Sequence, residues 1–157
     1  VAIDVDARAL ACAKENLSRL VGGRQIKLVE AHLFPDAAKH GLAHLIVCNP
    51  PWLPGKPSSA LEGAIYDEGS QMLKGFLQGV RSHLAPGGEA WLILSDLAEH
   101  LGLRAPDELP ALIKEAGLQV IGQSSTSPKH PKANDVTDLF FAARSREKTH
   151  LWRLRVA

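Results

Sequence analysis

The stretch that decides the fold is residues 44–52, which read HLIVCNPPW. Its first half is a short apolar run, which predicts a strand over residues 44–48. Because both faces of that strand are apolar, we expect it to be central and parallel to its neighbours. The two prolines after Asn49 cannot continue a central ladder, so the strand must end there. Ligands of open α/β sheets bind outside the carboxyl ends of the strands, which makes residues 49–52 the first candidate site.

Upstream of this stretch, residues 1–5 predict a short buried strand and residues 7–20 predict a helix. The helix has one apolar face, with Asp6 as its N-cap and Gly22-Gly23 at its end. The apolar face consists of residues at helical spacing, namely Leu10, Ala13, Leu17 and Leu20.

Further strands and helices alternate along the rest of the chain. We expect strands at 26–29, 89–94, 118–122 and 150–156, helices at 70–84, 107–116 and 134–146, a long loop at 53–69, a turn at 86–88 and a polar loop at 124–131. A short loop or helix covers residues 33–42. This alternation predicts an α/β fold with parallel strands and one antiparallel strand near the C-terminus.

Composition narrows the class of protein. The chain has 157 residues, with 18 Lys plus Arg against 17 Asp plus Glu, a net charge of +1. Such a balance argues against a protein that works mainly through phosphate electrostatics and against an acidic disordered chain. The length predicts one domain over residues 1–157. The apolar runs are too short for a membrane span, and with no visible signal peptide we expect a cytoplasmic protein.

The chain opens on Val1 inside an apolar run, and its only methionine is Met72. A natural N-terminus rarely begins inside a strand. We therefore expect that the beginning of this domain is missing from the sequence.

The candidate site offers hydrogen-bond acceptors beside a flat ring. The Asn49 carboxamide and the Pro50 carbonyl can both accept hydrogen bonds from one NH2 group, and Pro51 helps to fix the backbone. The Trp52 ring offers a face on which a planar group can stack. The alternative is a plain turn with a buried tryptophan.

A second signal is Asp4 at the end of the first strand, where an acid binds ribose hydroxyls in nucleoside-binding folds. Its alternative is that Asp4 and Asp6 only start the helix.

Several of these residues together resemble a known family. Asn49-Pro50-Pro51-Trp52 resembles the Asn-Pro-Pro-aromatic motif of class I S-adenosylmethionine-dependent methyltransferases that modify planar amine nitrogens, although Trp is a less usual aromatic there than Tyr or Phe. Two further segments resemble the release-factor glutamine methyltransferases and the wider small-domain methyltransferases. These are the strand and helix with Asp4, Ala9-Leu10, Ala13 and Asn16, and the Leu-x-Pro-Gly-Gly turn at Leu84-Ala85-Pro86-Gly87-Gly88.

The resemblance implies a Rossmann-like, three-layer sheet and S-adenosylmethionine as cofactor. It places Asp4 at the ribose and His32 at the adenine, and it makes Val5, Leu33 and Asn49 cofactor-binding residues as well. The family often has an acid where His32 stands, so a plain surface histidine is the alternative. Separately, we expect no metal site, because His40 and His44 are four residues apart but Gly41 lies between them and no third ligand is nearby.

The family's glycine-rich first strand and loop are absent and should lie before Val1. In the family's sheet this strand lies between the second and fourth strands. Its removal would leave the backbone groups of two central strands unpaired.

The leading interpretation is a methyltransferase that acts on a planar amine nitrogen. The acceptor would be a protein glutamine, as in a release factor, or the exocyclic amine of a base in RNA or DNA. The alternative is a non-catalytic binding module with this fold, or a subunit of a heteromeric methyltransferase. A dinucleotide-dependent oxidoreductase ranks last, because it gives the Asn49–Trp52 motif no role.

Other chemistry-bearing residues are expected to be structural. The acids Glu62, Asp67 and Glu68 are interpreted one by one as solvated loop residues, and Cys12 and Cys48 as small buried apolar residues. The basic residues of segment 127–157 could touch RNA, but a modest positive face is more often plain surface.

Overall fold

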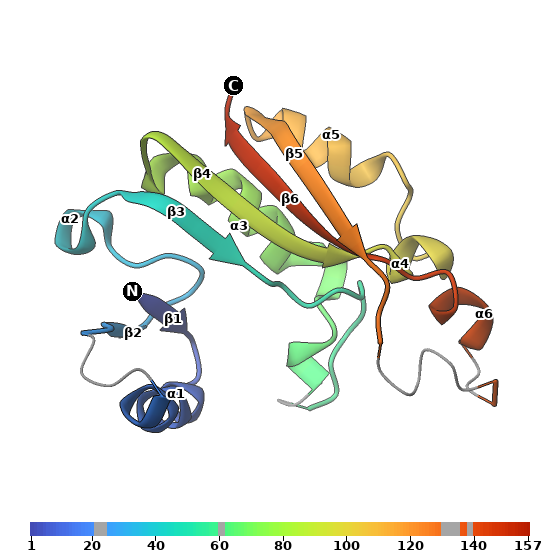
Figure 1. The fold of residues 1–157 in the computed structure, drawn as a ribbon, viewed down its shortest axis with the longest axis horizontal. Coiled ribbons are helices and arrows are strands. Elements are labelled where there is room, and N and C mark those ends of the chain that lie inside the picture. The colour runs from blue at the N-terminus through green and yellow to red at the C-terminus, as the bar shows by residue number, and fades with distance from the viewer. Residues whose placement is uncertain (21–24, 60–61, 130–135, 138–139) are drawn as a thin grey trace. The chain divides into compact units, whose positions relative to one another are not determined.

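The computed structural model of the chain describes residues 1–20, 25–59, 62–129, 136–137 and 140–157. The chain divides into two compact units, Val1–Leu42 and Ala43–Ala157 (Figure 1). Each unit carries its own sheet and is described by itself. The prediction of one domain over the whole chain stays a prediction.

The first unit is built on a pair of parallel strands, β1 (Ala2–Asp4) and β2 (Leu28–Glu30). Between them runs α1 (Ala7–Leu20), with the bounds predicted from its apolar spacing. β2 begins later than the predicted strand at 26–29.

The ends of the helices in this unit follow from capping. The Asp6 carboxylate accepts the Arg8 backbone N–H at 2.8 Å, so Asp6 caps α1 as predicted. The short helix α2 (Ala37–His40) begins with the same device, because the Asp36 side chain accepts from Ala38 at 2.9 Å. The predicted end of α1 at Gly22-Gly23 lies outside the described residues.

The second unit is a four-stranded sheet in the order β3-β4-β6-β5. Its elements, in chain order, are β3 (Ala43–Cys48), η1 (Glu62–Ala64), η2 (Glu68–Ser70), α3 (Gln71–Val80), η3 (Arg81–His83), β4 (Leu84–Ser95), α4 (Leu97–His100), α5 (Glu108–Glu115), β5 (Leu118–Thr126), α6 (Phe141–Arg144) and β6 (Thr149–Val156). β3 pairs in parallel with β4, whereas β6 is antiparallel to both of its neighbours. The predicted antiparallel strand near the C-terminus is thus confirmed.

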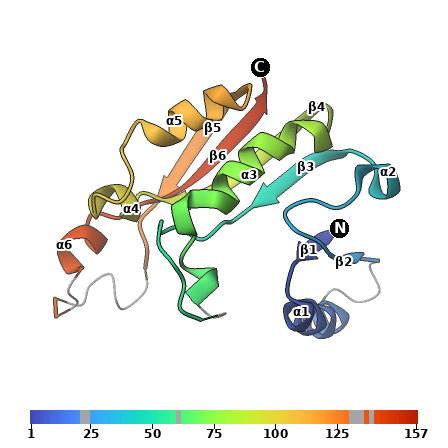
Figure 2. The ribbon, with the colours of Figure 1, turned by 180° about the vertical axis from the view of Figure 1, so that it is seen from behind.

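The core of this unit lies between the sheet and the helices α3 and α5, which cover one of its faces (Figures 1 and 2). The apolar residues of α3 fall at the spacing of a single helix face, which is why the helix packs flat on the sheet. Alternate residues of β4 face the same layer. None of these side chains is more than 2% exposed: Leu73, Phe76, Leu77, Val80, Ala90, Leu92 and Leu94.

One prediction about the start of β4 is wrong. Pro86-Gly87-Gly88 lies inside this strand and not in a turn before it. Gly87 takes a left-handed φ of 74°, which lets the chain bend while its pairing with β3 continues after a register shift. A Cβ on Gly88 would lie 2.9 Å from the Ala43 carbonyl oxygen, so the two strands approach closely only because this residue is glycine.

The position of β3 also differs from the prediction. Among the described residues it pairs with β4 alone, so it is an edge strand and not a central one. Leu45 and Val47 are 47% and 55% exposed. Apolar residues on both faces of a strand therefore do not predict how many neighbouring strands pair with it. Likewise β1 pairs with β2 alone in the described chain.

Smaller differences concern the C-terminal half. β5 extends to Thr126, so residues 124–126 of the predicted polar loop belong to a strand. The predicted helix at 134–146 is described only in part, where α6 lies. In the described ranges no helix is both long and apolar enough to cross a membrane.

The close approach at Gly88 yields a stability prediction. Gly88→Ala places a methyl group against backbone oxygens that cannot move aside independently. We expect the free energy of unfolding to fall by about 1–3 kcal/mol, measured by urea denaturation followed by circular dichroism. Gly63→Ala is the control, because nothing lies within 4 Å of its Cβ position. Equal stability of the two variants would contradict the close approach of the strands.

Candidate functional site

The Asn49–Trp52 turn begins at the carboxyl end of β3. Cys48, the last residue of the strand, is buried, and Pro50 is less than 2% exposed. Asn49 between them is exposed. The buried proline anchors the turn while the carboxamide next to it faces solvent.

The side chains of Asn49 and Trp52 are joined directly. The Trp52 indole N–H donates to Asn49 Oδ1 at 2.9 Å. A carboxamide oxygen can accept two hydrogen bonds, so this contact orients the amide and leaves one acceptor position. Sequence reasoning treated Trp52 as a flat face only and missed its role as a donor. The identity of the residue could have indicated this role. Phe has no hydrogen-bond donor on its ring, and the Tyr hydroxyl lies at a different position from the indole N–H.

The chain after the turn is held by a second segment. Leu53 N–H donates to the Ile65 carbonyl at 3.2 Å, and Asp67 N–H donates to the Leu53 carbonyl at 2.9 Å. These bonds form an isolated parallel bridge between Leu53 and Tyr66. The Tyr66 ring packs on Gly55, where a Cβ would lie 2.9 Å from it. The described parts of the loop at 53–69 are therefore anchored to the turn.

Asp67 is the residue on which this anchoring depends. It is 8% exposed, and its carboxylate accepts the backbone N–H groups of Met72 at 3.0 Å and Leu73 at 3.1 Å. It satisfies donors in the first turn of α3 that have no partner within the helix. The interpretation of Asp67 as a solvated loop acid is wrong, since it is a buried cap. Glu62 binds the backbone and hydroxyl of Ser58, both at 2.7 Å, and these bonds lower its pKa.

The thiol beside the turn is not a nucleophile. Burial, and to a lesser degree the charge of Asp67, raise the pKa of Cys48 to about 12. Cys48 is thus the small buried residue that we expected. Cys12 is exposed on α1, so the same expectation is wrong for Cys12, whose neighbours in that unit do not cover it.

In the first unit, Asp4 lies at the carboxyl end of β1. Its Oδ1 accepts the Asp6 N–H at 2.8 Å, which holds the carboxylate at the start of α1. The Asp4 side chain is exposed, and its Oδ2 has no hydrogen bond in the part of the chain that the structure describes. Asp4 therefore helps to start α1 and still presents a free acceptor oxygen, and its role at the ribose stays a prediction.

Three other predicted cofactor residues, Val5, His32 and Leu33, lie near Asp4 in the first unit, whereas Asn49 belongs to the second unit. Asp4 lies opposite Glu30, the last residue of β2, and His32 and Leu33 follow after Ala31. Leu33 adopts a left-handed φ of 65°, and Phe34 N–H donates to the His32 carbonyl at 2.8 Å, so the chain turns sharply there. The fold thus brings Asp4, Val5, His32 and Leu33 to one end of the small sheet. In the described residues no group of three or more His, Cys, Asp or Glu is placed to hold a metal.

Comparison with known proteins finds similarity in structure only. No protein-family model and no curated protein matches the sequence. Among solved structures, the ribosomal protein L11 methylase of Lactobacillus delbrueckii subsp. bulgaricus is similar over 98% of this chain, with a TM-score of 0.58 and 15% identity. TrmN of Thermus thermophilus is similar over 99%, with a TM-score of 0.55 and 20% identity. The N-methyltransferase NodS of Bradyrhizobium japonicum WM9, in complex with S-adenosyl-L-homocysteine, is similar over 98%, with a TM-score of 0.58 and 19% identity.

The chain has the class I methyltransferase fold. It covers 56%, 35% and 64% of these three proteins, so it spans less than two thirds of each. The expected fold class is confirmed. The small-domain subgroup and the site residues stay predictions.

The two cysteines allow a chemical test of the turn. Only the thiolate reacts with iodoacetamide. Because the pKa of Cys48 is raised to about 12, we expect this residue to stay unmodified at mildly alkaline pH in the folded chain. Exposed Cys12 should be alkylated, and both should react in urea, as read by mass spectrometry of the digested protein. Rapid labelling of Cys48 in the folded chain would show that the Asp67 anchor is open.

Proposed function

We propose that the chain is the catalytic part of an S-adenosylmethionine-dependent methyltransferase that acts on a planar amine nitrogen. The main observation in favour of this proposal is the Asn49 carboxamide. It is exposed at the carboxyl end of a parallel strand, and its oxygen is oriented by a hydrogen bond from Trp52. The fold and the similarity to an N-methyltransferase support this proposal. The acceptor is a protein glutamine or the exocyclic amine of a nucleobase.

The residues of the first unit suit the cofactor. Asp4 presents an exposed carboxylate oxygen at a strand end, and such an acid is suited to ribose hydroxyls. His32 is exposed at the same sheet end, where it can contact the adenine ring. S-adenosylmethionine would supply the methyl group as an electrophile.

The residues of the turn would orient the acceptor nitrogen. Its lone pair is delocalised into a carbonyl or a ring, so it is a weak nucleophile. Asn49 Oδ1 has one acceptor position left and can take one hydrogen of the NH2 group. That bond stabilises the positive charge that develops on nitrogen during transfer. The proton then leaves to solvent, so no strong base is required.

The Pro50 carbonyl is the natural second acceptor, but Pro50 is less than 2% exposed. In the described conformation a substrate therefore reaches Asn49 before it reaches Pro50. We assign the main role to Asn49 and expect the turn to shift when the acceptor binds. A macromolecular partner and a cytoplasmic location remain part of this proposal.

Loss of the carboxamide is the decisive test. Asn49→Ala in the full-length gene product that contains this chain should lower the turnover of methyl transfer by about 100- to 1,000-fold. The dissociation constant of S-adenosylmethionine, measured by calorimetry, should stay nearly unchanged. Asn16→Ala on α1 is the control with normal turnover. Wild-type protein that binds no S-adenosylmethionine would favour the non-catalytic module instead.

Substitutions of Trp52 separate its two roles. Trp52→Phe keeps a stacking face and removes the indole donor, which frees Asn49 Oδ1 for the substrate. We expect it to retain turnover within severalfold of wild type, because Phe is a usual aromatic in the motif that this turn resembles. Trp52→Leu loses the stacking face and should lose about 10- to 100-fold in kcat/KM for the acceptor. Equal activity of the two variants would argue against stacking.

A further inference from the structure

A cavity of about 200 Å³ lies in the second unit, apart from the Asn49–Trp52 turn. It opens between the carboxyl end of β4, strands β5 and β6, and the segment from α4 to α5. Its lining includes Leu94, Asp96, Glu99, Leu109, His150 and Trp152. Pockets for drug-sized ligands measure about 300–1,000 Å³, so this cavity suits a single side chain better than a cofactor.

One hydrogen-bond donor in the lining has no partner. The Trp152 indole Nε1 is buried and makes no hydrogen bond to any residue that the structure describes. The other two tryptophans behave differently, because Trp52 donates to Asn49 and Trp91 donates to Glu89, both at 2.9 Å. A buried donor without an acceptor is costly and uncommon, so this indole is a position where a ligand acceptor fits.

One acceptor in the same lining is also free. The Glu99 carboxylate has no hydrogen bond or ion pair with any residue that the structure describes, and it is half-buried. Burial and the nearby charge of Asp96 raise its pKa. Asp96 itself is already used, since it accepts Lys148 N–H at 2.7 Å and lies 3.4 Å from His150 Nε2.

We propose that this cavity binds an uncharged primary carboxamide, with its carbonyl on Trp152 Nε1 and its NH2 group on Glu99. A carboxamide offers one acceptor and two donors on one planar group, which complements the free indole and the free carboxylate. A cationic side chain has no acceptor and would leave the indole unpaired. A carboxylate or phosphate has no donor and would meet Asp96 and Glu99.

The carboxamide belongs to an asparagine or glutamine side chain of a peptide. The two acidic side chains disfavour the phosphates that accompany a nucleobase. The choice of a peptide as the molecule that carries the carboxamide rests on the proposed function. The choice of a carboxamide as the bound group does not. Cys48 lies opposite Leu92, so Ser95, the last residue of β4 and part of the cavity lining, lies about 10 Å further along the sheet. About three to four extended residues could therefore join an acceptor at Asn49 to this cavity.

The test is an NMR titration of the chain labelled on tryptophan, which has three indole signals. The signal of Trp152 is the one missing from Trp152→Phe or, if that variant does not fold, the one common to Trp52→Phe and Trp91→Phe. The probe is glutamine blocked as Nα-acetyl-glutamine N-methylamide. We expect millimolar probe to shift the Trp152 signal saturably and to leave the other two in place.

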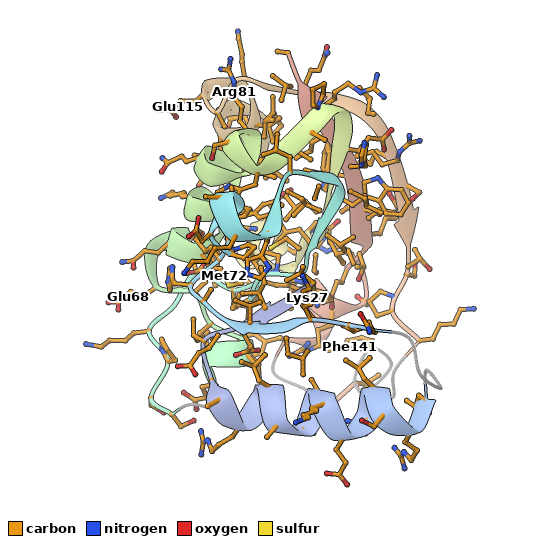
Figure 3. All side chains as sticks on the ribbon, turned by 90° about the vertical axis from the view of Figure 1, so that its left-hand side faces the viewer. Lys27, Glu68, Met72, Arg81, Glu115 and Phe141 are labelled. Carbon is orange, nitrogen blue, oxygen red and sulfur yellow. The ribbon has the colours of Figure 1, made fainter. Side chains whose placement is uncertain are left out.

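Variants and other probes make the test specific. Glu99→Met removes the acceptor but keeps a side chain of similar length. It should raise the dissociation constant of the glutamine probe at least about tenfold. Glu115→Met is the matched control, because Glu115 is exposed on α5 outside the cavity and points outward (Figure 3). No shift with the glutamine probe, an equal shift with blocked norleucine, or a larger one with blocked lysine or cytidine would overturn the proposal. The titration contains no S-adenosylmethionine, so its failure is distinct from failure of methyl transfer.

Discussion

The structure of the second unit depends on one buried carboxylate. Asp67 joins the loop after the motif to the main helix, because its N–H holds Leu53 and its oxygens hold the first turn of α3. α3 in turn supplies much of the core beneath the sheet. A loss of this contact would release the chain on the downstream side of the Asn49–Trp52 turn and uncap the helix together. The position of the exposed carboxamide is therefore tied to the packing of the core, although Asn49 itself packs against little.

The elements that were predicted well are those in which local sequence and packing agree. α1 and α3 have apolar residues at helical spacing, and α1 has a capping acid as well. Predictions were wrong where pairing with a distant strand decided the outcome. Gly87 and Gly88 carry the local signal of a turn, yet they lie inside β4, between its two stretches of pairing with β3. β3 carries the signal of a central strand, and the number of its neighbours is not encoded in its own residues.

The candidate site divides in the same way. The motif could be found from sequence, because two prolines after an apolar strand are rare and their effect on the backbone is local. The hydrogen bond from Trp52 to Asn49 could not, since it depends on side-chain rotamers across three residues. Asp67 was missed because an acid in a loop rich in glycine and serine has the pattern of a solvated residue. Only the fold reveals that it faces the start of α3. Asp4 was easier, because a strand end is visible in the alternation of elements.

Polar groups at the carboxyl end of β4 separate into two kinds. Ser95 donates to Glu147 at 2.6 Å and accepts Leu97 N–H at 3.0 Å, and Asp96 accepts Lys148 N–H. These bonds join α4 and the start of β6 to the end of β4, so Ser95 and Asp96 both serve the fold. Trp152 and Glu99 are not used in this way, although they line the same region. Since a buried donor costs free energy unless it is paired, packing alone does not explain the unpaired Trp152 indole in this lining. A ligand that pairs with both groups would account for them together.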